Sequence, residues 1–374
     1  MKSEWKKCTL KSDILFKNGK KRSDFEGIYP VYGGNGVLGY SNDYNNENVV
    51  IIGRVGAYCG SVYYEPYKCW ISDNAISAQS RTKSDTSIKY IYYLLCSLQL
   101  NKRHIGTSQP LLTQEILNRI GINLPSFSEQ CAIASTLSCL DDKIELNNKI
   151  NANLEAQAQA IFKSWFLDFD PFQDDEFVDS ELGRIPNGWR VGTLSEVATI
   201  TMGQSPSSRS YNEVGDGVVF YQGRAEFGWR FPSVRLYTTE PKRGAKENDI
   251  LVSVRAPVGD MNIAHEPCCI GRGLAALHSK TEHQSYLLYL LMNSKQLLDA
   301  FNGEGTVFGS INQKSFNNLV ILIPTNDIIE QYNTLCSPYD IQIKALSNEN
   351  RTLAALRDTL LPKLMSGEIE VSVN

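Results

Sequence analysis

Three glycines near the start of the chain are spaced as in a dinucleotide-binding loop. Gly34, Gly36 and Gly39 match G-x-G-x-x-G, a pattern in which backbone N–H groups and the start of a following helix hold a pyrophosphate. Here the polar run YSNDYNNEN follows the third glycine, so no helix N-terminus would face the phosphate. The sequence also contains no G-x-x-x-x-G-K-[ST] loop for a nucleoside triphosphate. We therefore predict no nucleotide-binding site.

Two acidic motifs could also do chemistry, but neither is complete. Residues 168–172, DFDPF, resemble the D-P-P-[YF] loop of amino-methyltransferases but lack one proline, and no cofactor glycine loop accompanies them. Residues 240–242, EPK, fit the E-x-K end of a metal-dependent nuclease, but no strand-borne aspartate precedes them at a suitable distance. The four histidines, His104, His265, His278 and His283, show no metal-ligand spacing. We predict no catalytic, cofactor-binding or metal site, and an enzyme centred on Asp168 or Glu240 is the alternative.

The remaining polar candidates suit binding better than catalysis. They follow glycine turns or end apolar strands, where a rigid element would hold them, and their types contact phosphates and the edges of bases. In the first half of the chain they are Lys20, Lys21, Arg22, Tyr32, Asn35 and Arg54. In the second half they are Gln204, Ser207, Arg209, Gln222, Arg224, Arg255 and Arg272. As a set they predict a nucleic-acid contact surface, whereas any one of them alone is more commonly a solvated surface residue.

These candidates belong to two copies of one sequence pattern. Near the start of each copy, a set of residues recurs 184 positions later, with Trp5, Thr9, Leu10 and Gly19 matching Trp189, Thr193, Leu194 and Gly203. Near the end of each copy the shift is 199 positions, with Gly106, Thr107, Gln114 and Pro125 matching Gly305, Thr306, Gln313 and Pro324. The second copy has therefore gained residues in its middle. Long internal repeats indicate two copies of one structural unit.

Each copy predicts a small α+β unit followed by a long helix. Short β-rich runs broken by Gly, Asn and Pro predict strands and tight turns, and residues 87–101 and 284–301 predict short helices. After each closing proline, apolar residues alternate by four and three positions, which predicts a heptad seam. The seam residues of the first copy are Leu137, Leu140, Ile144, Asn151, Leu154 and Ile161. Those of the second copy are Ile343, Leu346, Asn350, Leu353 and Leu360.

Polar residues within the two seams bear on how the long helices pair. Asn151 and Asn350 occupy matching positions of the repeat. A buried asparagine opposite another fixes register at a cost in stability, so we expect the two helices to pack on each other with these residues facing. The alternative is that both face solvent. Pro338 and Pro362 lie in the second helical pattern, and they allow an interruption at Pro362.

The composition is that of a globular protein with unevenly distributed charge. Of 374 residues, 42% are hydrophobic and 21% charged, with a net charge of −4. Residues 1–125 are net basic and residues 126–184 strongly acidic, so the former would hold a polyanion and the latter repel it.

The N-terminal residues lack the apolar stretch of a secretory signal, and no window approaches a membrane span. We expect a cytoplasmic protein without membrane contact. Its nine cysteines show no CxxC spacing, and their odd number means that they cannot all pair, so we expect reduced thiols, as is usual in the cytosol.

Over essentially its whole length the chain resembles the specificity subunits of type I restriction-modification enzymes. The segments that carry the resemblance are residues 29–40, 165–172, 181–189, 254–260, 270–277 and 356–369, among them YPVYGGNGVLGY, WFLDFDPF and ELGRIPNGW. The resemblance implies two target recognition domains, each reading half of a bipartite site on double-stranded DNA. It also implies long helices that set the distance between half-sites and dock two methyltransferase subunits, and through them restriction and translocase subunits. S-adenosylmethionine, ATP and Mg²⁺ would belong to those partner chains.

The expected fold is α+β, with two tandem mixed α/β target recognition domains separated by a pair of long antiparallel coiled-coil-like helices in pseudo-two-fold symmetry. The expected segments are recognition domain 1 (1–125), the central helix (126–170), a linker (171–184), recognition domain 2 (185–324) and the C-terminal helix (325–374). Because the recognition stretches of the two copies differ, we expect an asymmetric target. The competing interpretations are a self-contained DNA methyltransferase or nuclease, and a scaffold whose β-rich units bind protein or glycan.

Overall fold

The chain folds into two compact units. A computed structural model describes residues 5–21, 26–82, 86–106, 108–303 and 309–372. One unit comprises Met1–Asn148 and Ser347–Asn374, and the other Lys149–Leu346. Each unit therefore contains one β-rich domain together with one part of each long helix, so the structural units do not coincide with the consecutive copies of the sequence repeat.

The domain of the first unit is built on a six-stranded sheet in the order β2-β7-β5-β6-β3-β4. Its strands are β2 (Ile14–Asn18), β3 (Tyr29–Gly33), β4 (Gly36–Ser41), β5 (Asn46–Gly53), β6 (Val62–Ile71) and β7 (Ala75–Ser80). A separate pair joins β1 (Lys6–Thr9) to β8 (Gly121–Leu124). The helices are α1 (Leu10–Asp13), α2 (Ile88–Ser97) and α3 (Gln114–Asn118), with single turns at Gly56–Tyr58 and Leu100–Lys102.

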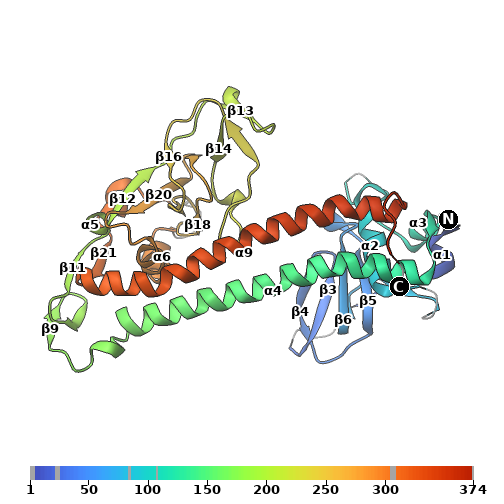
Figure 1. The fold of residues 1–374 in the computed structure, drawn as a ribbon, viewed down its shortest axis with the longest axis horizontal. Helices are drawn as coiled ribbons and strands as arrows, with labels where there is room; N and C mark the ends of the chain where they lie inside the picture. The colour runs from blue at the N-terminus through green and yellow to red at the C-terminus, as the bar shows by residue number, and fades with distance from the viewer. Residues whose placement is uncertain (1–4, 22–25, 83–85, 107, 304–308, 373–374) are drawn as a thin grey trace. The chain divides into compact units, whose positions relative to one another are not determined.

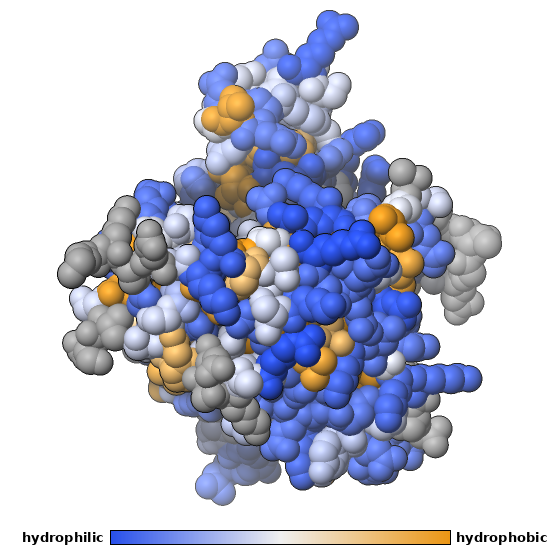
Figure 2. Space-filling view, turned by 90° about the vertical axis from the view of Figure 1, so that its right-hand side faces the viewer, coloured by the Kyte–Doolittle hydropathy of each residue, from blue (hydrophilic) through white to orange (hydrophobic). Residues whose placement is uncertain are grey.

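Strand β5 lies at the centre of this sheet and is buried on both faces. Val50 and Ile52 belong to the main core with α2 and the first turns of the long helix, whereas Val49 and Ile51 belong to a smaller core on the other face. A continuous apolar run is what a strand covered on both faces requires. The outer surface of this unit in Figure 2 is mainly hydrophilic, with its apolar side chains in small separate groups.

The domain of the second unit has two sheets where the first has one. One sheet has the order β12-β20-β17-β18 and the other β13-β15-β14-β19-β16. The strands of the first are β12 (Ala198–Met202), β17 (Ile250–Ser253), β18 (Met261–Ile263) and β20 (Leu274–Ser279). Those of the second are β13 (Tyr211–Asn212), β14 (Val218–Tyr221), β15 (Leu236–Thr238), β16 (Gly244–Ala245) and β19 (Cys268–Ile270).

Shorter elements complete the second unit. Strands β11 (Arg190–Thr193) and β21 (Val320–Ile323) pair as β1 and β8 do. The elements around the expected linker, residues 171–184, are a single turn at Asp170–Phe172 and a hairpin of β9 (Phe177–Ser180) and β10 (Gly183–Pro186) that extends two residues beyond it. The helices are α5 (Leu194–Val197), α6 (Gln284–Asn293), α7 (Lys295–Asp299) and α8 (Gln313–Asn317), with turns at Ser208–Ser210 and Arg224–Glu226.

Both long helices are continuous. Helix α4 spans Phe127–Phe166 and helix α9 spans Asn326–Ser366; at 1.5 Å per residue each is about 60 Å long. The interruption that Pro362 would allow does not occur, and α9 also passes through Pro338. A proline removes one backbone hydrogen bond, and buried neighbours such as Cys336 and Leu364, which belong to the cores of their units, hold the adjacent turns in place.

Within the first unit, α4 and α9 run in opposite directions (Figure 1). Asn147 donates to Asn350 at 2.9 Å, and Asp141, earlier on α4, accepts from Arg357, later on α9, at 2.7 Å. Asn350 in turn donates to Asn148 at 2.8 Å. The partners of Asn350 thus lie about one turn before the expected Asn151, because matching places in a repeat need not be opposite in an antiparallel pair.

Within the second unit, the same two helices are held together by aromatic packing. The hydroxyl of Tyr332 on α9 donates to the carbonyl of Ala158 on α4 at 3.0 Å. The Tyr332 ring lies 5.6 Å from that of Phe162 and 5.2 Å from that of Phe166, both edge to face. All eleven expected seam residues are buried or half-buried, namely Leu137, Leu140, Ile144, Asn151, Leu154, Ile161, Ile343, Leu346, Asn350, Leu353 and Leu360.

Candidate nucleic-acid interface

Four backbone hydrogen bonds gather the strand ends of the first domain into one frame. The donors are Gly19, Lys20, Ser72 and Arg54, and the acceptors in the same order are Ala75, Ile71, Tyr32 and Asn74, at 3.0, 3.0, 2.9 and 2.9 Å. The frame joins the segments after β2, β3, β5 and β6. A Cβ on Gly19 would lie 2.0 Å from the Ser72 carbonyl oxygen, so this close approach requires glycine.

The second domain contains the same frame. The donors are Gly203, Gln204, Gly271 and Val254, and the acceptors are Leu274, Ile270, Tyr221 and Gly273, at 2.9, 3.0, 2.8 and 2.9 Å. A Cβ on Gly203 would lie 2.1 Å from the Gly271 carbonyl oxygen. The glycines that mark the repeat therefore have one physical reason in both copies, and the frame aligns the two domains residue by residue.

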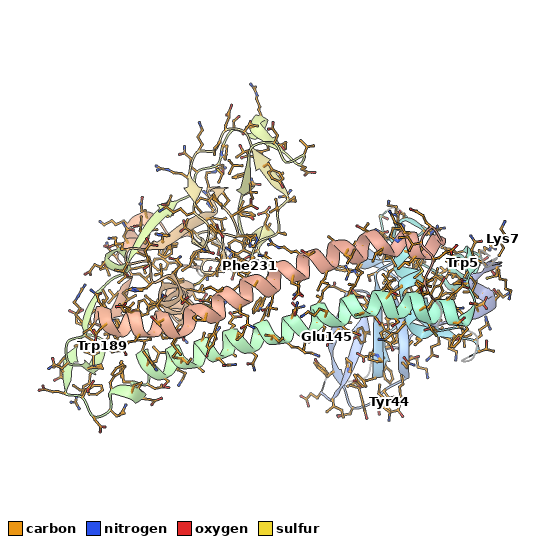
Figure 3. All side chains as sticks on the ribbon, in the orientation of Figure 1. Trp5, Lys7, Tyr44, Glu145, Trp189 and Phe231 are labelled. Atoms are coloured by element: carbon orange, nitrogen blue, oxygen red, sulfur yellow. The ribbon has the colours of Figure 1, made fainter. Side chains whose placement is uncertain are left out.

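In the first domain the frame presents a mixed set of exposed polar side chains. Lys20, Lys21, Asn35, Asp73 and Asn74 are all exposed. Lys20 lines a hollow of about 480 Å³ together with Tyr44, and the ammonium of Lys68 lies 4.4 Å from the Tyr44 ring centre. Tyr44 lies at the end of this domain that points away from α4 (Figure 3). Arg22 lies outside the described residues.

In the second domain the frame presents amides and arginines. The exposed candidates are Gln204, Ser207, Arg209, Gln222, Arg224, Arg255 and Arg272. Gln204 follows β12, Gln222 follows β14 and Arg272 lies in the turn between β19 and β20, so three separate segments bring them to one edge. Arg224 forms an ion pair with Asp260, beside a hollow of about 610 Å³ that both residues line.

Comparison with known families decides what kind of protein contains two such frames. Residues 2–156 and 186–350 each match the family model of the type I restriction modification DNA specificity domain. The chain belongs to this family. Each match covers one β-rich domain and a large part of the long helix that follows it, so both specificity domains contain the frame. The family that the sequence resembles is thereby confirmed.

Individual relatives agree with this assignment. The chain is 35% identical over 292 residues to the putative type I restriction enzyme MjaX specificity subunit of Methanocaldococcus jannaschii, covering 75% of this chain and 68% of the relative. It is 27% identical over 330 residues to the HindI specificity subunit of Haemophilus influenzae, covering 70% and 71%. The fold is similar to the crystal structure of the type I restriction-modification system S subunit from M. genitalium, with a TM-score of 0.61, 20% identity and 96% of each chain covered. The expected fold class is confirmed.

Two candidates in the first specificity domain are held by contacts within the protein. Tyr32 is only 9% exposed, and its hydroxyl donates to Glu65 at 2.9 Å. Burial and this hydrogen bond raise the pKa of Tyr32, so the hydroxyl stays neutral and its proton is engaged. Tyr32 is thus packed and hydrogen-bonded within the domain, and its contact with DNA stays a prediction. Arg54 is half-buried, and its guanidinium donates to the Asp73 carbonyl at 3.4 Å.

Arg54 and Arg255 each follow an apolar strand, but they are offset by one residue. Isolated bridges join Val55 to Leu111 in the first domain and Arg255 to Ser310 in the second, which makes Val55 the counterpart of Arg255. Successive residues of an extended segment point to opposite sides. Arg255 is accordingly exposed where Arg54 is half-buried.

Asp73 and Asn74 were missing from the candidate set. They form the turn between β6 and β7, and the 199-residue shift of the repeat aligns Asp73 with Arg272, which was a candidate. Applying that shift to every candidate would have revealed Asp73, whereas Asn74 aligns with Gly273, which was not a candidate. Within the described parts of the chain, no helix is long and apolar enough to cross a membrane, no group of three or more His, Cys, Asp and Glu could hold a metal ion, and the nine cysteines are free thiols.

Proposed function

We propose that this chain reads DNA sequence for a type I restriction-modification complex in the cytoplasm, with each specificity domain reading one half of a bipartite, asymmetric site. The observation that supports this is the pair of matched frames. Their backbone hydrogen bonds are the same, but the side chains they present differ. A common scaffold with different exposed donors and acceptors is what two readers of unrelated short sequences require, because base edges are distinguished by hydrogen-bond pattern.

The long helices give this proposal its geometry. Helices α4 and α9, each about 60 Å long, would set the distance between half-sites. They also carry exposed apolar side chains that could pack against other subunits, namely Leu146, Leu335, Ile341 and Leu356. We assign these exposed side chains, which lie on the helix segments of both units, to contacts with two methyltransferase subunits, which in turn would hold the restriction and translocase subunits.

Catalysis in this proposal belongs to the partner chains. The sequence lacks the phosphate loop and the complete methyltransferase motif that ATP hydrolysis and methyl transfer would use. S-adenosylmethionine, ATP and Mg²⁺ would therefore bind the other subunits, and this chain is non-catalytic. Incubating the purified chain with labelled S-adenosylmethionine and DNA, and separately with Mg²⁺ and DNA, should give no product. Activity of the chain alone would favour an enzyme centred on Asp168 or Glu240.

A domain exchange tests the assignment of half-sites. Residues 1–125 are replaced by the corresponding segment of a relative that has a different target, and the complex is expressed in cells whose methylated sites are then sequenced. We expect one half of the methylated site to change while the other half and the spacer persist. Alteration of both halves would refute independent reading.

The scaffold alternative makes a different prediction about salt. Contacts between basic residues and phosphates release counterions, so DNA affinity falls steeply as salt rises. We expect the assembled complex to show this steep dependence. Binding to DNA that is insensitive to salt, or absent, would instead support a protein-binding or glycan-binding scaffold.

A further inference from the structure

The turn between β6 and β7 and the turn between β19 and β20 are equivalent, and each presents one charged residue at its centre. The residue before the centre donates to the end of a neighbouring strand, from Ser72 to Tyr32 at 2.9 Å and from Gly271 to Tyr221 at 2.8 Å. The residue after the centre accepts a backbone hydrogen bond at 2.9 Å in both domains. The central residues are Asp73 and Arg272, so one fixed backbone position carries opposite charges.

The two charged side chains are held at fixed positions by the buried strand residues on either side of each turn. The strand residues that flank the turns, Ile71 and Ala75 in one domain and Ile270 and Leu274 in the other, are fully buried. The side chains of Asp73 and Arg272 are exposed. Their backbones are bonded to neighbouring side chains, because Arg54 donates to the Asp73 carbonyl at 3.4 Å and the Arg272 N–H donates to Ser205 at 3.2 Å. Among the described residues, however, the side chain of neither Asp73 nor Arg272 forms a hydrogen bond or an ion pair. A charged group held in this way is suited to an external partner.

We infer that Asp73 and Arg272 are specificity-determining residues that contact base edges in the two half-sites, an inference that rests on the proposed function. The negative charge of Asp73 distinguishes a base contact from a phosphate contact. A carboxylate is repelled by phosphates and finds hydrogen-bond donors on DNA only at base edges, above all the N4 amino group of cytosine. Because the two turns are equivalent, Arg272 also lies at a base edge in this inference. A guanidinium there pairs with O6 and N7 of guanine.

The experiment uses the full chain assembled with methyltransferase subunits, binding a library of bipartite sites. The variants are Asp73→Asn and Arg272→Gln, and the controls are Asp179→Asn and Arg184→Gln, register partners on the β9–β10 hairpin whose side chains are exposed. We expect Arg272→Gln to lose about 5- to 150-fold preference for guanine at one position. Asp73→Asn should weaken the preference for cytosine at one position of the other half-site. The controls should leave both preferences unchanged.

Salt dependence provides a second readout. Loss of a base contact should leave the slope of log affinity against log salt unchanged, whereas loss of a phosphate contact reduces it by about 1. A uniform loss of affinity with a smaller slope for Arg272→Gln, or an unchanged base preference for Asp73→Asn, would overturn the inference. Failure of the unsubstituted complex to select any bipartite site would instead overturn the proposed function.

Discussion

Asp141 and Asp340 occupy the same position in the two copies of the repeat, and each accepts a hydrogen bond from a tyrosine of the neighbouring short helix. Tyr93 donates to Asp141 at 2.6 Å and Tyr289 donates to Asp340 at 2.9 Å. Each aspartate also pairs with an arginine. In the first unit this is Arg357 from α9, but in the second it comes from the specificity domain itself.

That second arginine, Arg230, joins three elements of its unit. It is 4% exposed, forms an ion pair with Asp340 on α9, lies 3.3 Å from Glu155 on α4, and donates to Tyr289 on α6 at 3.2 Å. Removing one partner of a buried ion pair leaves the other charges uncompensated. The contact therefore fixes the second specificity domain on the helix segments of its own unit.

We predict that Arg230→Met lowers the free energy of unfolding by about 3–5 kcal/mol. The matched control is Arg224→Met, because Arg224 forms an ion pair with Asp260 at an exposed site where such pairs contribute about 0–1 kcal/mol. Urea unfolding followed by tryptophan fluorescence measures both variants. Equal effects of the two substitutions would show that the buried network does not stabilise the domain.

The pH dependence of the same variant has a defined sign. Burial raises the pKa of Glu155, and the nearby Arg230 opposes that rise. Without Arg230, the pKa of Glu155 in the folded state rises further above its value in the unfolded chain. Stability is therefore lost as the pH rises from the unfolded pKa through the folded pKa of Glu155. The penalty of Arg230→Met should be larger at pH 8 than at pH 5. In the Arg230→Met, Glu155→Gln double variant this difference should shrink, and a penalty independent of pH would contradict the assignment.

The polar contact within the first unit can be tested by a double-mutant cycle. Asn147 is fully buried, and its amide donates to Asn350 at 2.9 Å and to Glu349 at 2.7 Å. Asn147→Leu or Asn350→Leu alone leaves polar groups unpaired and should cost about 1–3 kcal/mol. The double variant should recover part of this loss through apolar packing, as measured by urea unfolding. Additive losses would mean that the two amides are not coupled.

The sequence predicted those features that depend on local pattern or on repetition. The seam around Leu137 and Ile343 follows from spacing, and Gly19 and Gly203 were found because they recur. The register between the two long helices was not predictable, because packing along the whole helix pair determines which residues lie opposite Asn350. The one-residue offset between Arg54 and Arg255 was missed for a related reason, since the sequence does not mark where the second copy gained residues.

That offset leads to opposite expectations for the two arginines. Arg255 is exposed and, within the described residues, forms no side-chain hydrogen bond or ion pair, so Arg255→Ala should leave stability within about 0.5 kcal/mol of the unsubstituted chain. If it contacts phosphate, the slope of log affinity against log salt should fall by about 1.

Arg54 is half-buried, and its Nε is enclosed without a hydrogen-bond partner. Arg54→Ala should therefore change stability through lost packing and leave the slope unchanged. DNA titrations over a range of salt concentrations, together with urea unfolding, measure both effects, and a reversed pattern would show that Arg54 is the residue that faces DNA.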